Sequence, residues 1–353
     1  MTGDATVPDG TGVLSVDREA GRAFVRGDPD RLVDISKTDR HGQPLRTVID
    51  MGTGLVRNDP IPSDEDLARF YAEDYRKDYK AAERPRARQV LRNFRRVAAH
   101  VEVHAAVILP RPRVLDVGAG SGEFLFTMAD LGKETRGIEP NRAYAAHCRE
   151  ALGLDVQTAP LSPDLFDAGS ADLIRLHHVL EHLNDPVGYL AMIAHWLAPG
   201  GVLWIDVPDI EGYARSKSRG GMFHYGHIFN FCPETLRMTA ALAGLAEHAS
   251  TAASSRRRMG GFFERAAHPV TDSRPTDPET AARVKAAIDA HYAGQARDAA
   301  DGASRAIRRP LAKLSARLEE SWSAILAGGG AAAIGRRETA RLRTRLRAAG
   351  LMA

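Results

Sequence analysis

Three glycines at alternate positions, Gly118, Gly120 and Gly122, follow an apolar run that ends in Asp116-Val117. Their spacing differs from the dinucleotide fingerprint Gly-x-Gly-x-x-Gly, whose last glycine packs beside a pyrophosphate. Glu123 stands at that last position, and the Lys-Ser/Thr pair of a phosphate-binding P-loop does not follow. The turn therefore suits a nucleoside ligand that approaches the backbone closely and has no pyrophosphate.

A second acidic signal supports a nucleoside. Glu139 ends the short predicted strand that contains Thr135-Arg-Gly-Ile-Glu139, and it precedes Pro140. A carboxylate at the end of a second strand can accept hydrogen bonds from both hydroxyls of a ribose. An adenosine without a pyrophosphate fits the glycines and Glu139 together.

Four histidines stand where a second substrate would lie. His177 and His178 follow an apolar run, and His224 and His227 lie in the glycine-containing segment 208–231. Histidine is the natural proton acceptor near neutral pH. The candidate bases are His178, His227 and His224, whereas His182 is expected to stabilise a turn.

Alternating strand and helix patterns position these residues. Strands are predicted at 112–117, 134–138, 155–157, 172–176 and 202–207, and helices at 84–108, 123–132, 142–151, 187–197 and 233–243. Such alternation indicates an α/β fold with a parallel, doubly wound (Rossmann-like) sheet, which segments 245–249 and 257–265 complete as an antiparallel pair. Ligands bind at the carboxyl ends of the strands in such sheets. Segment 208–231 is predicted to be a long functional loop, and residues 21–26 a short strand.

Three motifs in order resemble class I S-adenosylmethionine-dependent methyltransferases: Val114–Leu125, Gly137–Asn141, and the run from Ala171 to Pro186 that contains Leu-Glu-His. The nearest likeness is the Leu-Glu-His branch, which includes sugar and glycan methyltransferases. The resemblance implies S-adenosylmethionine as cofactor, with Asp116 near its ammonium group and its adenine near Pro160-Leu161. The cofactor-binding residues expected from the motifs and the resemblance are Asp116, Gly118, Ala119, Gly120, Gly122, Glu139, Pro140, Leu161 and His177.

The resemblance also bears on the reaction. The segment Phe223-His-Tyr-Gly-His-Ile-Phe-Asn-Phe231 is similar to the Tyr-His-Glu-His-x-x-Tyr-Phe stretch of sugar C-methyltransferases, and His227 matches its final histidine. His224 and Gly226 replace the tyrosine and the glutamate. We therefore expect O-methylation of a sugar, glycan or other hydroxylated acceptor. Carbon methylation of a nucleotide-sugar is the alternative.

Residues 1–83 resemble the N-terminal module of sugar-modifying relatives, residues 84–268 form the expected methyltransferase domain, and residues 269–353 form a helical, basic extension. The relatives carry zinc-binding cysteine pairs in that module. Here Asp50 and Thr53 stand at the corresponding positions, so we expect no metal there. The module is expected to cover an edge of the acceptor site or to form a homodimer interface.

The composition is that of an ordinary globular protein, with 44% hydrophobic and 26% charged residues. No secretory signal or membrane-length apolar run is visible, and two cysteines cannot build a disulfide framework, so we expect a soluble, cytoplasmic protein. The basic residues from Thr271 onward are interpreted as a solvated helix face rather than a polymer or membrane contact, and no nucleic-acid partner is expected. Arg215, Lys217 and Arg219 in the predicted loop favour an anionic acceptor.

Two other classes stay open. A nicotinamide-dependent oxidoreductase is disfavoured by Glu123 and by Leu-Glu-His. A non-catalytic S-adenosylmethionine-binding partner protein is compatible with intact motifs, because folds host binding as readily as catalysis. Cofactor turnover separates a binding protein from an enzyme.

Overall fold

The computed structural model describes residues 18–73, 85, 87–216, 221–249, 258–267, 277–300 and 330–352. Its central sheet has seven strands in the order β10-β11-β8-β7-β4-β5-β6. These are β4 (Arg113–Val117), β5 (Glu134–Ile138), β6 (Val156–Gln157), β7 (Ala171–His177), β8 (Leu197–Pro208), β10 (Leu245–Glu247) and β11 (Arg258–Arg265). Strands β4 to β8 are parallel to one another. Strand β11 pairs with β8 and with β10 in the antiparallel direction and so completes the sheet. The predicted doubly wound α/β fold is confirmed.

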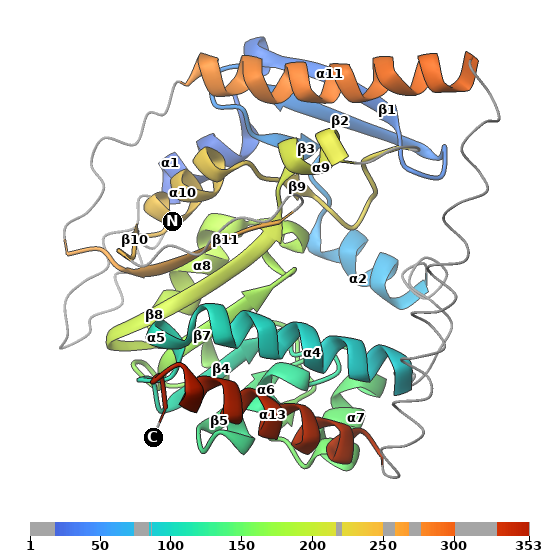
Figure 1. The fold of residues 1–353 in the computed structure, drawn as a ribbon. Helices are drawn as coiled ribbons and strands as arrows, with labels where there is room; N and C mark the ends of the chain where they lie inside the picture. The colour runs from blue at the N-terminus through green and yellow to red at the C-terminus, as the bar shows by residue number, and fades with distance from the viewer. Residues whose placement is uncertain are drawn as a thin grey trace.

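Helices cover both faces of this sheet (Figure 1). One face carries α4 (Ala87–Val103), α5 (Ala105–Ile108), α6 (Glu123–Asp130), α7 (Arg142–Leu152) and α13 (Ala331–Ala348), and the other carries α1 (Arg18–Arg26), α8 (Pro186–His195) and α10 (Pro233–Leu242). Short 3-10 turns lie at η1 (Pro29–Arg31), η2 (Pro163–Leu165) and η3 (Leu180–His182). Leu115 and Val117 of β4 pack on the α8 face and Val114 on the α4 face, so this strand is buried on both sides, as parallel strands are.

A smaller antiparallel sheet joins the N-terminal residues to a distant segment. Its order is β1-β2-β3-β9, with β1 (Leu32–Thr38), β2 (Pro44–Asp50), β3 (Val56–Asn58) and β9 (Phe229–Asn230). Helices α9 (Ile210–Ser216) and α11 (Pro278–Ala300) pack against this sheet and each other, and α2 (Asp64–Glu73) follows β3. The segment that carries His224 and His227 (residues 221–228, here called the histidine segment) directly precedes β9. The smaller sheet therefore holds one end of the histidine segment.

Two local predictions were wrong. Residues 21–26 belong to helix α1, in which Phe24 and Val25 are buried and Gly21 lies close to Val187 of α8; a Cβ on Gly21 would lie 2.7 Å from that side chain. The predicted loop 208–231 contains helix α9, whose start is stabilised by the Asp209 carboxylate, which accepts a hydrogen bond from Glu211 N at 3.0 Å.

Asp50 and Thr53, which replace the expected zinc ligands, belong to a tight turn between β2 and β3. The Asp50 carboxylate accepts a hydrogen bond from Gly52 N at 2.7 Å, and the Thr53 hydroxyl accepts one from Leu55 N at 3.2 Å. Backbone hydrogen bonds from Thr53 N and Gly54 N to Asp50 O close the turn. Side-chain and backbone hydrogen bonds thus stabilise the turn.

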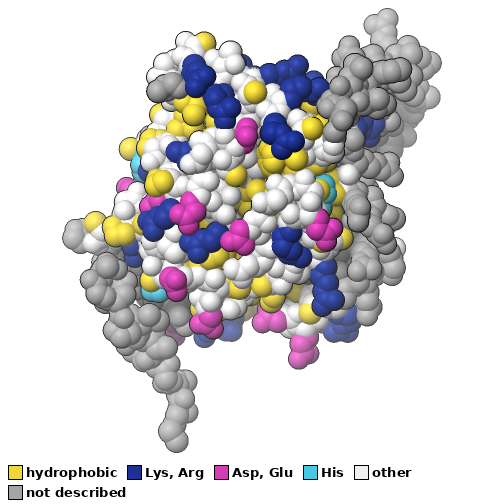
Figure 2. All heavy atoms as spheres, turned by 90° about the horizontal axis from the view of Figure 1, so that it is seen from below, with side chains coloured by type: hydrophobic (Ala, Val, Ile, Leu, Met, Phe, Trp, Pro, Cys, Tyr) yellow, Lys and Arg dark blue, Asp and Glu magenta, His cyan; other side chains and the backbone are white. Residues whose placement is uncertain are grey.

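Helix α13 packs lengthwise along α4 (Figure 1). Its arginines meet acidic groups on the body of the protein: Arg345 Nε lies 2.8 Å from Glu102 Oε2, and Arg343 lies near Asp130. Figure 2 shows basic and acidic side chains interspersed on the face seen from below. The described part of the basic extension therefore contributes to intramolecular ion pairs.

Candidate functional site

The glycine turn follows β4 and is fixed by its backbone. Gly118 N and Ala119 N both donate to Ile138 O of β5, at 2.8 and 2.9 Å. Gly118, Gly120 and Gly122 have φ values of 75°, 56° and 84°, a region that only glycine adopts readily. A Cβ on Gly118 would lie 2.6 Å from Val179, whereas a Cβ on Gly120 would meet no atom within 4 Å. The turn packs tightly at Gly118 and is open at Gly120.

Glu139 is tied to this turn. Its Oε2 accepts a hydrogen bond from Gly120 N at 2.8 Å, and its Oε1 accepts one from Asn141 N at 2.8 Å. The side chain is buried, and burial raises the pKa of its carboxyl while the two N–H donors oppose that shift. Each carboxylate oxygen has a second lone pair, so the group can still accept hydrogen bonds from a ligand.

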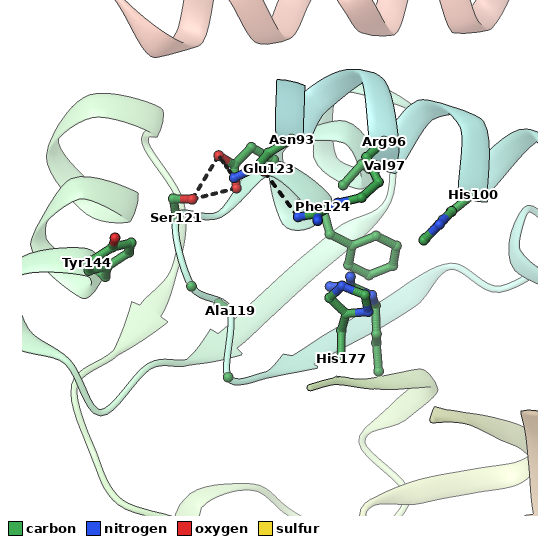
Figure 3. Close-up of a pocket in the computed structure, with 13 residues that line it drawn as sticks. Asn93, Arg96, Val97, His100, Ala119, Ser121, Glu123, Phe124, Tyr144 and His177 are labelled. Carbon is green, nitrogen blue, oxygen red and sulfur yellow. Dashed lines mark hydrogen bonds between the residues drawn. The ribbon is translucent and has the colours of Figure 1, made fainter. Parts of the chain in front are cut away.

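A cavity of about 180 Å³ opens beside the turn, between α4 and the ends of β4 and β7 (Figure 3). It is smaller than the roughly 300–1,000 Å³ of drug-sized ligand sites, so it suits one end of a cofactor rather than all of it. It is lined by Asn93, Arg96, Val97, His100, Gly118, Ala119, Gly120, Ser121, Glu123, Phe124, Tyr144, Arg175 and His177.

Asp116 faces a neighbouring strand instead of this cavity. It pairs in register with Arg175 of β7, and Arg175 Nη1 donates to its two oxygens at 3.1 and 3.2 Å. Burial raises the pKa of Asp116 to about 6, and Arg175 opposes that shift. The guanidinium lies 4.4 Å from the Phe124 ring centroid and 5.4 Å from that of Trp204. The Asp116 carboxylate, which the resemblance places near the cofactor's ammonium, thus forms a buried ion pair with Arg175.

Glu123 forms a second buried polar group beside the cavity. Its carboxylate accepts from Ser121 Oγ at 2.7 and 2.8 Å and from Asn93 Nδ2 of α4 at 3.1 Å (Figure 3). Burial raises the pKa of Glu123, and these donors oppose the rise. The residue that excluded a dinucleotide fingerprint thus joins the turn to α4.

Sequence reasoning missed the residues of α4 that line the cavity. Asn93, Arg96, Val97 and His100 recur at helical spacing i, i+3, i+4 and i+7, so they form one stripe of the helix. That mostly polar stripe was a usable signal, because the predicted helix 84–108 leads directly into the first predicted strand of the sheet. Arg175 carried a weaker signal, a single charge inside an otherwise apolar strand.

His177 and His178 lie where β7 ends. His177 lines the cavity, its Nδ1 is 3.4 Å from Asp206 Oδ2, and burial together with Arg175 lowers its pKa well below the usual value. His178 has a φ of 57°, uncommon for a non-glycine residue, and its Nδ1 lies 3.0 Å from Glu181 Oε1. The centroids of the two rings are 4.6 Å apart, so His178 is separated from the cavity by the His177 side chain.

The other histidines gather around His182. The rings of His182 and His227 are 4.8 Å apart, and those of His224 and His227 are 4.0 Å apart. Burial lowers the pKa of His182, and it lowers that of His227 well below the usual value, with further lowering of the latter by His182 and His224. The structure therefore brings His178, His224 and His227 beside the Leu-Glu-His turn, and His177 beside His178.

The N-terminal sheet holds this histidine segment. Asn58 N donates to Ile228 O at 2.8 Å, Asn58 Nδ2 donates to Tyr225 O at 3.1 Å, and the rings of Phe70 and Tyr225 lie 5.0 Å apart. From the other side His182 Nδ1 contacts Gly226 O. The segment is thus fixed between the two sheets.

The remaining predicted residues lie elsewhere. Pro140 is exposed beside Glu139, and half-buried Leu161 packs on the core beneath α8. Arg215 pairs with Glu211 at 3.1 Å within α9. Lys217 and Arg219 lie outside the described residues. Among the described helices none is long and apolar enough to cross a membrane.

Residues 82–249 match a protein family described as "Methyltransferase domain". The ubiquinone biosynthesis O-methyltransferase of Xanthomonas campestris pv. campestris (strain B100) is 34% identical over 111 residues, which are 30% of this chain and 46% of that protein. An uncharacterized methyltransferase of Mycobacterium sp. (strain JLS) is 31% identical over 156 residues, which are 40% and 62% of the two chains. The chain thus spans about half the length of several curated relatives that it matches.

Two solved structures are also similar. The 1,6-didemethyltoxoflavin-N1-methyltransferase of Burkholderia thailandensis, with bound S-adenosylhomocysteine, is 18% identical with a TM-score of 0.43, over 60% of this chain and 96% of that one. The magnesium protoporphyrin IX methyltransferase of Synechocystis PCC 6803 is 17% identical with a TM-score of 0.43, over 57% and 100%. The family match supports a methyltransferase domain at residues 82–249.

Proposed function

We propose that this chain is an S-adenosylmethionine-dependent methyltransferase that methylates a hydroxyl group of a small acceptor, with a histidine as base. The observation that carries the proposal is the buried Glu139 carboxylate, held at the open point of the glycine turn by Gly120 N. This arrangement fits a ribose diol next to a turn that leaves room for a ligand at Gly120. When bound, S-adenosylmethionine supplies a methyl group activated by its sulfonium.

The chain's own residues divide the remaining tasks. Glu139 would orient the ribose, and the cavity under α4 would enclose the amino acid end, where Arg96 and Arg175 offer positive charge to a carboxylate. Phe124 and Val97 in the same lining exclude water from that end. Methyl transfer needs alignment of the acceptor above all, and the histidine segment, held by hydrogen bonds from Asn58, would provide it.

His178 is the strongest candidate for the base. Its side chain is partly exposed beside the cavity. A neutral imidazole that donates from Nδ1 to Glu181 has an Nε2 lone pair that can take the proton from the hydroxyl group of the methyl-accepting substrate. His227 and His224 are more enclosed by their neighbours. We therefore propose His178 before His227 and His224, and O-methylation before carbon methylation, which needs a more strongly positioned base.

A sugar or glycan is the acceptor that the Leu-Glu-His and His227 motifs favour, and a quinone precursor is the second candidate, after the name of the Xanthomonas relative. Purified protein with methyl-labelled S-adenosylmethionine and each acceptor class should give labelled product and S-adenosylhomocysteine. His178→Ala should lower kcat by about 10²–10⁴-fold without changing cofactor affinity.

His195→Ala, on α8 away from the cavity, is the matched control and should keep full activity. Full turnover by His178→Ala would remove the base assignment. Cofactor binding without turnover on any acceptor would favour the non-catalytic partner protein.

A further inference from the structure

Glu181, the acid of the Leu-Glu-His turn, is a buried carboxylate in histidine surroundings. It is 1% exposed, and among the described residues His178 is the basic side chain within ion-pair distance. Its Oε1 lies 3.0 Å from His178 Nδ1, while its Oε2 has no hydrogen-bond partner in the described part of the chain. A buried carboxylate oxygen without a donor is costly, which points to a ligand that the carboxylate is built to receive.

Two histidines offer ligand atoms to the same point. Potential ligand atoms of Glu181, His182 and His227 all lie within 4.8 Å of one another. His182 Nδ1 meets the carbonyl oxygen of Gly226, so this nitrogen carries the proton and Nε2 holds the free lone pair. A ring N–H donated to a backbone carbonyl is how metal-binding histidines are usually oriented. Glu181 is buried and the two histidines are half-buried.

We propose that Glu181, His182 and His227 bind one divalent transition-metal ion beside the end of β7. Two imidazole nitrogens and one carboxylate oxygen suit Zn²⁺, Co²⁺ or Fe²⁺ better than Mg²⁺, which prefers oxygen ligands. Three protein ligands leave a coordination position open, as in catalytic rather than structural zinc sites.

The ligand assignment stands on these contacts, whereas its role rests on the proposed function. A metal ion at this place can bind the acceptor hydroxyl and lower its pKa, so that His178 receives the proton more readily. The Glu181 oxygen that contacts His178 is the one not assigned to the metal, so both contacts are compatible. The prediction of no metal rested on the absence of thiolates and of clustered histidines in the N-terminal module.

The test is titration of metal-free, full-length protein with Zn²⁺ against a competing chromophoric chelator, and with Co²⁺ followed by its visible absorption. We expect one ion per chain and the absorption bands of a nitrogen- and oxygen-coordinated Co²⁺. Glu181→Gln and His227→Gln should each weaken Zn²⁺ affinity at least 10-fold. His224→Asn is the matched control: it keeps an acceptor for Gly226 N, which now bonds to His224 Nδ1 at 3.2 Å, and should change affinity less than threefold.

Circular dichroism and thermal unfolding establish that each variant is folded, and Co²⁺ spectra of the folded variants decide the assignment. The inference is overturned by wild-type protein that binds neither ion, or by equal loss in His224→Asn. Loss of binding in Asp206→Asn with none in His227→Gln would also overturn it, because the ion would then belong to the neighbouring group His177, His178 and Asp206. S-adenosylmethionine titration of the same samples is independent: cofactor binding without metal binding overturns only this inference, and the reverse overturns the proposed function.

Discussion

The side chain of Asp116 is fully buried, and burial raises its pKa to about 6, which allows a test of its ion pair with Arg175. Its folded pKa exceeds the unfolded value of about 4, so between about pH 4 and 6 the folded chain holds more protons than the unfolded chain. The unfolding free energy contributed by this group therefore falls as pH rises through that window, by about 3 kcal/mol at most for a shift of about two units. Urea unfolding at several pH values should show a smaller fall in Asp116→Asn than in wild type, because Glu123 and Glu139, whose pKa values burial also raises, titrate in both proteins. Parallel pH profiles for the two proteins would contradict it.

Gly120 gives a second residue-scale prediction. A Cβ added at Gly120 would project into open space, but the residue has a φ of 56°, which L-residues with side chains rarely adopt. Gly120→Ala should therefore cost about 1–2 kcal/mol of folding free energy through backbone strain. The alanine side chain would also occupy room beside Glu139. The loss of S-adenosylmethionine binding free energy should therefore exceed the loss of folding free energy. Gly132→Ala, also at positive φ with open space and remote from the cavity, is the control and should leave affinity unchanged. Unfolding and calorimetry on both variants separate strain from ligand contact.

Among single residues, Glu139 was predictable because one strand end and one turn specify it locally. The pairing of Asp116 with Arg175 was not, since it depends on β4 and β7 lying side by side in a particular register, which sequence spacing between distant strands does not reveal. The contact between Glu181 and His178 was likewise hidden: it needs a histidine in a left-handed conformation, a state that residue type predicts poorly.

Among the elements, helix α13 is attached mainly by its apolar side. Leu342 is fully buried against the α4 face, whereas the Arg345–Glu102 pair is largely exposed. Leu342→Ala should therefore cost about 2–5 kcal/mol of unfolding free energy, and Arg345→Ala less than about 1 kcal/mol. Denaturant unfolding of the two variants compares them directly, and an equal cost would mean that charge, not packing, attaches the helix.

The N-terminal sheet predicts a kinetic effect through Asn58. Its side chain donates to Tyr225 O, so Asn58→Ala removes one of the contacts that fix the histidine segment. We expect kcat/KM for the acceptor to fall about 10-fold while the Kd for S-adenosylmethionine stays within twofold, because Glu139 and the glycine turn are untouched. Steady-state kinetics with the acceptor found active would check this. Ser36→Ala, exposed on β1, is the control.

Sequence patterns predicted the central elements well where local signals mark them. Helix α7, for example, is capped by Asn141 and Gly153, and strand β4 is buried on both faces. The patterns failed where burial depends on a distant partner. The sequence of helix α1 predicts a strand, and its helical form depends on the packing of Phe24 and Val25 near α8 and α10. The glycines around α9 predict a loop, but α9 is a helix that packs against the sheet formed by residues 32–58 and 229–230.

At the scale of the whole molecule, the two sheets meet at the histidine segment. The central sheet supplies the glycine turn, Glu139 and His178, and the smaller sheet fixes residues 221–228 opposite them. Under the proposed function, the cofactor would bind on the first side and the acceptor on the second. Truncation of the smaller sheet is therefore expected to abolish acceptor turnover before cofactor binding.

The most direct measurement is titration calorimetry of wild type and Glu139→Ala with S-adenosylmethionine, S-adenosylhomocysteine and NAD. We predict that wild type binds the first two and not NAD, and that Glu139→Ala weakens binding by about 1–3 kcal/mol because ribose hydroxyls lose their acceptor. Asp164→Ala, an exposed acid outside the cavity, should leave binding unchanged. Tighter binding of NAD, or unchanged affinity in Glu139→Ala, would contradict the account.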